Sequence, residues 1–200
     1  MTVTRDLRPL LPATLCCATA TLLAACSPQT GGTPSPTSAP TFASGSATST
    51  AVTAPKVSSP KSLTGIDSCQ LLTPPQLQTL GATAAPKTKK TPWGETECQW
   101  VNSDISVYVA PDTTQGKGLA TVYGNSNTFS GFIPVQVAGY PAVSVNKQSR
   151  SCSVYVGSSD TQTFLVDFTR LGGQRADYQD PCGFAQTVAG AVLANLPAGK

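Results

Sequence analysis

The sequence contains no histidine, and only 12% of its 200 residues are charged. Without histidine the chain cannot form a Ser-His-Asp triad, a Cys-His pair or the usual zinc sites of hydrolases. It also lacks a G-x-S-x-G elbow, a P-loop and a Gly-rich dinucleotide fingerprint. We therefore expect no catalytic residue, no metal site and no cofactor.

The basic side chains are few and dispersed. Residues 63–200 hold nine basic and nine acidic side chains, and the only basic cluster is formed by Lys87, Lys89 and Lys90. A nucleic-acid-binding protein needs a basic face that neutralises several phosphates. Nucleic acid is therefore excluded as an expected partner.

The first 26 residues have the pattern of a bacterial lipoprotein signal. Arg5 and Arg8 precede an apolar stretch, which ends in the tetrapeptide Leu23-Ala24-Ala25-Cys26. Small residues directly before a cysteine are typical of the lipoprotein processing site, so residues 1–25 are interpreted as the signal peptide. We expect Cys26 to carry the lipid, such as palmitate, and to hold the exported protein at the outer face of the cytoplasmic membrane. The alternative is an ordinary secretory signal that leaves Cys26 as a free thiol.

Residues 26–62 are predicted to be a disordered tether. Thirty of the thirty-six residues from 27 to 62 are Ser, Thr, Pro, Ala or Gly. Such a segment buries too little apolar surface to offset the entropy lost on ordering. The folded domain is predicted to comprise residues 63–200.

Periodicity within the domain predicts an α+β fold with an antiparallel sheet of about six strands. Thr73-Pro74-Pro75-Gln76 predicts a capped helix that ends at Gly81. Asp180 is predicted to cap a C-terminal helix that has one apolar stripe, formed by Phe184, Val188, Val192 and Leu196. A weaker helical pattern covers residues 117–123, and residues 86–94 are expected to form a loop. Alternating apolar residues predict strands at 97–101, 104–110, 133–137, 143–145, 152–156 and 164–168.

Four cysteines fall inside the domain, in short motifs that occur in a fixed order. The motifs are Asp67-Ser68-Cys69, Cys98-Gln99-Trp100, Cys152-Ser153-Val154 and Asp180-Pro181-Cys182. Together with the signal and the tether, they resemble a large actinobacterial family of secreted lipoproteins known only as a domain of unknown function. The resemblance covers about residues 63–197 and implies a fold and a location, but no activity. In element order the chain is also similar to the sandwich of PsbP and Mog1-like proteins, a weaker likeness.

An even number of domain cysteines in an exported chain favours two disulfides. The preferred pairs are Cys69–Cys98 and Cys152–Cys182, because each ties the start of a helix to a strand. The alternative pairs Cys69 with Cys182 and Cys98 with Cys152, which would join the two helices and two strands. A catalytic cysteine is disfavoured, since no histidine is present to lower its pKa.

The expected function is that of a binding or accessory module of the cell envelope. Phe129 and Phe132 interrupt a Gly/Asn/Ser loop, and Trp93 lies in another loop, so these three aromatic residues are the candidate contacts for a partner. The competing interpretation is that the two phenylalanines pack the loop onto the core. The partner would be an unknown envelope protein or a small ligand. The alternatives are an envelope hydrolase that uses carboxylates and a structural envelope protein without a specific ligand.

Overall fold

The computed structural model describes residues 53–199. The predicted signal peptide, Cys26 and the tether up to residue 52 lie outside the described residues. No helix within residues 53–199 has the length and apolar character that crossing a membrane requires.

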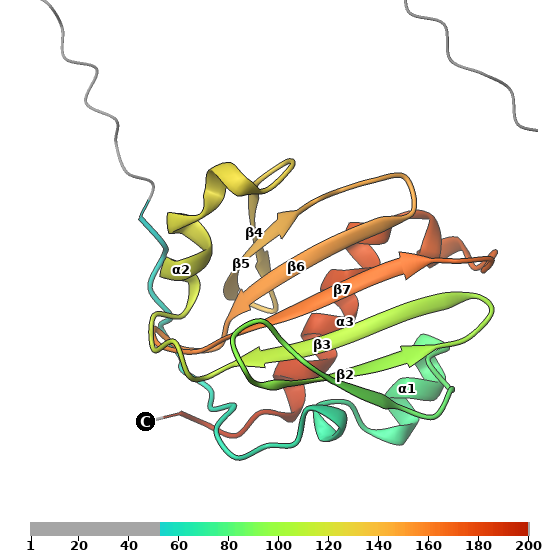
Figure 1. Cartoon of the computed structure of the whole chain (residues 1–200), viewed down its shortest axis with the longest axis horizontal. Helices are drawn as coiled ribbons and strands as arrows, with labels where there is room; N and C mark the ends of the chain where they lie inside the picture. Colours follow the sequence, from blue (N-terminus) through green and yellow to red (C-terminus); the bar gives the residue numbers. More distant parts are fainter. Residues whose placement is uncertain (1–52, 200) are drawn as a thin grey trace, which may run out of the picture. The chain divides into compact units, whose positions relative to one another are not determined.

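One antiparallel sheet organises the described part of the chain (Figure 1). Its seven strands lie in the order β1-β2-β3-β7-β6-β5-β4. Their bounds are Lys87–Lys90 (β1), Thr96–Val101 (β2), Ile105–Asp112 (β3), Ile133–Val137 (β4), Tyr140–Val145 (β5), Ser151–Gly157 (β6) and Thr163–Arg170 (β7). The α+β class and the antiparallel arrangement agree with the sequence prediction.

The prediction of about six strands misses β1, which was expected to be part of a loop. Its four residues are Lys-Thr-Lys-Lys, and all four side chains are exposed, so no apolar alternation marks the strand. β1 pairs antiparallel with β2 along one edge only. Lysines on this edge and Pro134 in the opposite edge strand β4 are features that discourage pairing with another chain.

Helix α3 (Pro181–Asn195) packs against one face of the sheet, mainly on β6 and β7. Phe164, Val166 and Phe168 of β7 point to this face and are fully buried. The predicted apolar stripe of α3 supplies the other side of the same core. The predicted capping role of Asp180 is wrong in one respect. Asp180 occupies the N-cap position, but its side chain makes no capping hydrogen bond, and its carbonyl accepts from Phe184 instead.

Helix α1 (Pro74–Leu80) begins and ends as its sequence predicts. Thr73 and Gln76 form a capping box: the Thr73 Oγ1 accepts from the Gln76 N–H, and the Gln76 Oε1 accepts from the Thr73 N–H. Gly81 ends the helix in the left-handed conformation, with φ 74° and ψ 13°. Local sequence therefore fixes both ends of this helix.

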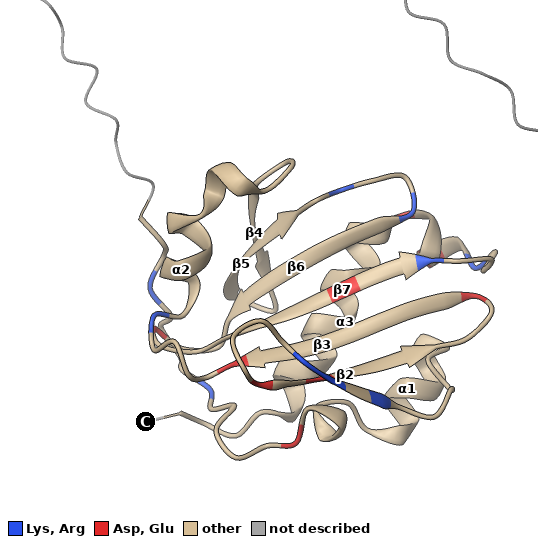
Figure 2. Ribbon diagram, viewed as in Figure 1, with Lys and Arg blue, Asp and Glu red and all other residues tan. Residues whose placement is uncertain are grey.

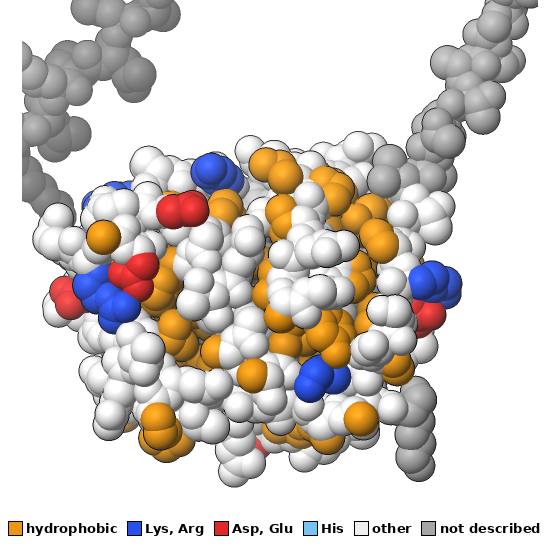
Figure 3. All heavy atoms as spheres, turned by 180° about the vertical axis from the view of Figure 1, so that it is seen from behind, with side chains coloured by type: hydrophobic (Ala, Val, Ile, Leu, Met, Phe, Trp, Pro, Cys, Tyr) orange, Lys and Arg blue, Asp and Glu red, His pale blue; other side chains and the backbone are white. Residues whose placement is uncertain are grey.

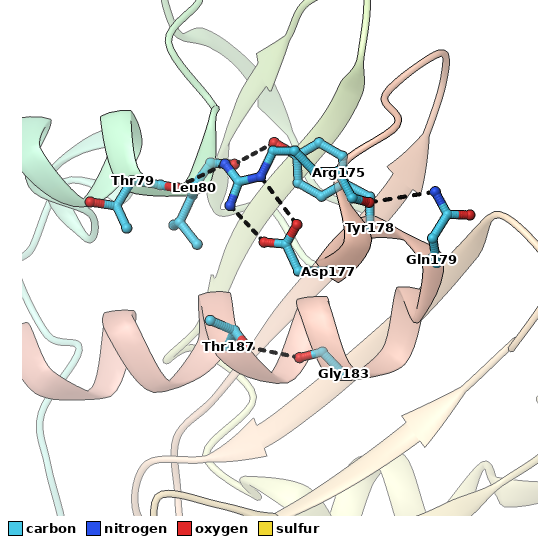
Figure 4. A network of polar contacts seen from close by, with 8 residues as sticks. All are labelled: Thr79, Leu80, Arg175, Asp177, Tyr178, Gln179, Gly183 and Thr187. Atoms are coloured by element: carbon cyan, nitrogen blue, oxygen red, sulfur yellow. Dashed lines mark hydrogen bonds and ion pairs between the residues drawn. The ribbon is translucent and has the colours of Figure 1, made fainter.

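A clamp of polar contacts joins the end of α1 to η3 (Ala176–Gln179), as Figure 4 shows. The Tyr178 hydroxyl donates to the Leu80 carbonyl at 2.9 Å, and Arg175 Nη1 donates to the Thr79 carbonyl at 2.9 Å. The Arg175 guanidinium also forms an ion pair with Asp177 and lies over the Tyr178 ring. These contacts occupy the polar groups of the clamp, so we assign it a structural role.

Two disulfides fasten helical segments to strands. Cys69 of η1 (Ser68–Gln70) is joined to Cys98 of β2, and Cys152 of β6 is joined to Cys182 of α3. These are the two pairs that were preferred from the sequence. Each closes a loop of about thirty residues, which constrains the unfolded chain by about 3–4 kcal/mol in the entropic model.

The end of the predicted tether, residues 53–62, lies against the domain, and we refer to it as the strap. The Val57 N–H donates to Asp160 Oδ1 at 3.0 Å, and the Lys61 N–H donates to the Ser158 carbonyl at 2.7 Å. Lys61 also forms an isolated antiparallel bridge with Ala198. The folded part therefore begins before Leu63. Backbone hydrogen bonds, rather than apolar side chains, hold most of the strap in place.

Candidate binding cleft

The sheet face opposite α3 is covered only in part. Helix α2 (Leu119–Gly124) and the following η2 (Ser126–Thr128) cover its β5 and β6 side, where Leu119, Val122 and Tyr123 form a second core with Val143 and Val145. Beside this cover, Ala110, Leu165 and Tyr155 lie in one row across β3, β7 and β6. This row is the floor of a cleft that opens between α2 and the β1–β2 turn.

Aromatic side chains form two walls of the cleft. Trp93, from the β1–β2 turn, is held by a hydrogen bond from its Nε1 to the Pro111 carbonyl at 2.7 Å. Phe129, which follows η2, packs on the Tyr155 ring with 5.7 Å between ring centroids. The cleft has a volume of about 520 Å³, which is within the range of small-molecule sites.

The structure separates the three aromatic residues that the sequence nominated. Trp93 and Phe129 line the same cleft, although they come from loops on different parts of the chain. Phe132 does not line it: its ring packs edge-on against Tyr123, with centroids 5.1 Å apart. For Phe132 the competing interpretation, a plug that holds the loop on its core, therefore fits the geometry, and Phe129 packs against the same second core while also lining the cleft.

Tyr155 joins the floor to the Phe129 wall and is not among the residues that the sequence nominates. The alternation of β6 points Cys152, Val154 and Val156 toward α3, and this places Tyr155 on the opposite face. A large aromatic residue at an outward position of a central strand was the available signal. On a sheet face expected to meet water, such a residue indicates a second packed layer or a binding surface.

Uncharged polar groups lie around the apolar lining. Thr121 and Asn125 come from α2 and its end, and Gln115 comes from the loop after β3. The one acidic residue of the lining, Asp112, is only 7% exposed. Its carboxylate accepts hydrogen bonds from the backbone and side-chain amides of Gln115, at 3.2 and 2.5 Å. No lysine or arginine lines the cleft.

Burial perturbs two titratable groups on this face of the sheet. It raises the pKa of Tyr155, and the negative charges of Asp167 and then Asp112 raise it further, so the phenol stays neutral at pH 7. Burial also raises the pKa of Asp167, and the hydrogen bond that its Oδ2 accepts from Ser153 Oγ at 2.6 Å offsets part of this effect. Figure 2 shows the corresponding red segment on β7, with most other charges at the ends of strands.

Asp112 of the cleft and Asp167, two carboxylates of this face, are too far apart to act as a pair. Asp112 is the β3 partner of Thr163, and Asp167 lies four residues beyond Thr163 on β7. Four residues of strand span about 13 Å. Paired carboxylates of glycoside hydrolases are about 5–9.5 Å apart. No cluster of three potential metal ligands occurs within residues 53–199.

Two other surfaces are weaker candidates for a binding site. A hollow of about 540 Å³ lies beside the Cys69–Cys98 disulfide, where the buried Trp100 indole N–H has no hydrogen-bond partner among the described residues. It lacks the opposed aromatic walls and the array of polar groups of the cleft. Figure 3 shows the side on which α3 lies, where hydrophobic and uncharged surface predominates and charged side chains are few. Nothing in the structure indicates what would cover that side.

A family model described as "Protein of unknown function (DUF3558)" matches residues 21–195. No curated protein and no solved structure matches the chain. The matched range includes the whole sheet, both disulfides and every residue that lines the cleft. The chain therefore belongs to the DUF3558 family.

Proposed function

We propose that this protein is a membrane-anchored lipoprotein of the cell envelope, and that its domain binds a ligand in the cleft between Trp93 and Phe129. The observation that carries the proposal is the convergence of Trp93, Phe129 and Tyr155 on one concave site. Aromatic residues on loops above a rigid sheet are common anchors of binding sites. The protein would act as a binding or accessory module, presented to the outside of the cytoplasmic membrane.

Two features of the chain support export and anchoring. The tetrapeptide Leu23–Cys26 has the order of a lipoprotein processing site, and the domain carries two disulfides, which persist in oxidising compartments. The family resemblance to actinobacterial secreted lipoproteins points to the same location. The likeness to the PsbP and Mog1-like sandwich remains a proposal about architecture, and architecture does not assign function.

Binding is favoured over catalysis by the chemistry of the cleft. Asp112 is held by Gln115, and the separation of about 13 Å from Asp167 is too large for paired acid/base work. The remaining polar groups of the lining are amides and hydroxyls, which do not titrate near pH 7. Such groups orient a ligand but do not exchange protons with it at neutral pH.

The anchor is tested by metabolic labelling of cells with a fatty acid that can be tagged. The native chain is expected to take up label and to sediment with membranes, and Cys26→Ala is expected to lose both properties. Cys17→Ala is the matched control, because Cys17 lies within the predicted signal peptide. Labelling that survives Cys26→Ala would refute the anchor.

The cleft is tested by photo-crosslinking in cells. The photoreactive amino acid p-benzoylphenylalanine is introduced in place of Pro92, an exposed residue at the lip of the cleft, or in place of Lys147, an exposed residue in the β5–β6 turn. Crosslinked species that form from position 92 and are absent from position 147 would support the proposal. Identical patterns from the two positions would refute the cleft as the binding site.

A further inference from the structure

The cleft has a chemical character that narrows the class of ligand. We propose that it binds an uncharged sugar, as the end of a neutral glycan or as a free saccharide. This inference rests on the proposed binding function and adds the ligand class. It follows from three properties of the lining: its charge, its aromatic walls and its unused hydrogen-bonding capacity.

Charge excludes the anionic ligands of the envelope. A phosphate or carboxylate ligand would enter a site without lysine or arginine and would meet the negative charge of Asp112. The nearby Asp167 adds to the same negative potential, which already raises the pKa of Tyr155. Phosphorylated sugars and acidic lipids are therefore disfavoured.

A cationic ligand would find a single counter-ion in the lining, Asp112, which is nearly buried and already hydrogen-bonded to Gln115. Asp112 is 7% exposed, and both of its oxygens accept hydrogen bonds from Gln115. Asp167 does not line the cleft. A buried ammonium group needs a carboxylate that can contact it, since desolvation of an unpaired charge is costly. The lining thus favours a ligand without charge.

The walls suit a ligand that has one apolar face. Trp93 stands on one side of the cleft, and the Phe129–Tyr155 pair stands on the other, with no ring contact between the two sides among the described residues. The space between them is open to a ring inserted from solvent. The negative face of an aromatic ring attracts the weakly positive C–H groups that a sugar presents on one face.

Neutral polar groups with spare capacity surround these walls. Asn125 Nδ2 donates to the Thr121 carbonyl, whereas the Asn125 Oδ1 accepts no hydrogen bond in the described part of the chain. The Tyr155 hydroxyl forms no hydrogen bond with another of the residues 53–199. Gln115 keeps its side-chain carbonyl for a ligand, because only its amide nitrogens are used. Sugar hydroxyls donate and accept, which matches this mixture of groups.

The size of the cleft agrees with this class. Its volume of about 520 Å³ is that of a site for a drug-sized ligand, which is the scale of a disaccharide. Val122 and Leu165 make the deep part apolar, and the amide and hydroxyl groups lie around it. A ligand with an apolar ring face and a hydroxylated edge would use both parts.

The test uses the full chain in lipid nanodiscs prepared without glycoside detergents, which carry sugar head groups. Isothermal titration calorimetry compares three probes: a set of uncharged disaccharides, the same sugars as phosphates, and benzyltrimethylammonium. We expect saturable binding of at least one neutral disaccharide and binding at least about tenfold weaker for its phosphate. Stronger binding of the phosphate or of the ammonium probe would overturn the proposed class.

Substitutions in the cleft test whether the sugar binds there. Trp93→Ala removes one wall and is expected to weaken binding at least about tenfold. Tyr155→Phe removes only a hydroxyl and is expected to weaken it about three- to tenfold. Tyr108→Phe is the matched control, since Tyr108 lies on the same face of the sheet but does not line the cleft. Equal loss in Tyr108→Phe and Tyr155→Phe, or unchanged binding in Trp93→Ala, would contradict the assignment.

Tryptophan fluorescence tests independently whether the ligand binds in the cleft. The chain has two tryptophans, and Trp100 is only 1% exposed, so a ligand in the cleft should change the emission of Trp93. The change should vanish in Trp93→Phe. If no neutral sugar binds while position 92 still yields its specific crosslinks in cells, the ligand class is wrong and the binding function stands. If position 92 yields no specific crosslinks either, both proposals fail.

Discussion

Replacing Gly81 by alanine tests how the clamp at the end of α1 stabilises the domain. Gly81 has φ +74°, a conformation that residues with a Cβ rarely adopt. A Cβ at this position would also overlap the hydroxyl oxygen of Tyr178. That hydroxyl is buried with its ring, which is 2% exposed, and it donates to the Leu80 carbonyl.

The expected loss of unfolding free energy in Gly81→Ala has two parts. The left-handed conformation costs alanine about 1–2 kcal/mol. Displacing the Tyr178 hydroxyl leaves the buried Leu80 carbonyl without its donor, which costs about 1–3 kcal/mol more. Gly81→Ala should therefore lower the free energy of unfolding by about 2–5 kcal/mol, a large share of the 5–15 kcal/mol typical of a domain.

Gly65 provides a matched control. It has φ +76°, and nothing lies within 4 Å of a Cβ built on it. Gly65→Ala should lose only the conformational part, about 1–2 kcal/mol. Urea unfolding of the full chain with its disulfides intact, followed by tryptophan fluorescence, measures both losses.

A double-mutant cycle isolates the clash. In the Tyr178→Phe background the hydroxyl is absent, and the ring carbon Cζ lies 3.6 Å from the new Cβ, an ordinary contact. Gly81→Ala should then cost about the same as Gly65→Ala. If Gly81→Ala costs the same in both backgrounds, the assumed contact with the Tyr178 hydroxyl is wrong.

Three further predictions concern the cross-link, the sheet face and the first helix. Removing one disulfide with Cys152→Ala and Cys182→Ala together should lower the free energy of unfolding by about 3–4 kcal/mol, and non-reductive peptide mapping of the native chain should recover these two cysteines linked. Because burial raises the pKa of Asp167, the native state is stabilised by protonation of this group. Asp167→Asn, which keeps an acceptor for Ser153, should therefore increase stability at pH 7, and the increase should fade as the pH drops below about 4. Thr73→Ala should cost about 1 kcal/mol in thermal or urea unfolding, because it removes the capping box. A gain from Asp167→Asn that persists unchanged at low pH would show that the gain does not come from the charge of the carboxylate. A neutral Thr73→Ala would show that the capping box contributes nothing to stability.

The sequence predicts the parts of the fold whose signals are local. The residues Thr73-Pro74-Pro75-Gln76 contain the complete capping box, and the structure confirms the start of α1 there. The alternation in β7 identifies the face that packs on α3, because Phe164, Val166 and Phe168 share it. In both cases, residues within one turn or one strand determine the outcome.

The parts that escaped prediction depend on partners remote in sequence. β1 has four exposed polar residues, and its strand conformation comes from pairing with β2. The strap is as rich in Ser, Thr and Pro as the sequence before it, but its backbone hydrogen bonds with residues about a hundred positions away hold it in place. The cleft likewise needs the tertiary fold: Trp93 and Phe129 could be nominated separately, but their convergence around Tyr155 could not be foreseen.

The strap also determines how the domain would respond to mechanical load. A pull from the N-terminal side would first reach the few hydrogen bonds of residues 53–62, and the first covalent cross-link met after them is at Cys69. Peeling the ten residues from 53 to 62 would lengthen the chain by about 35 Å while the sheet and its cleft stayed intact. In a domain tethered to one layer of the envelope and bound to another, the strap would thus detach and extend before the bound surface deformed.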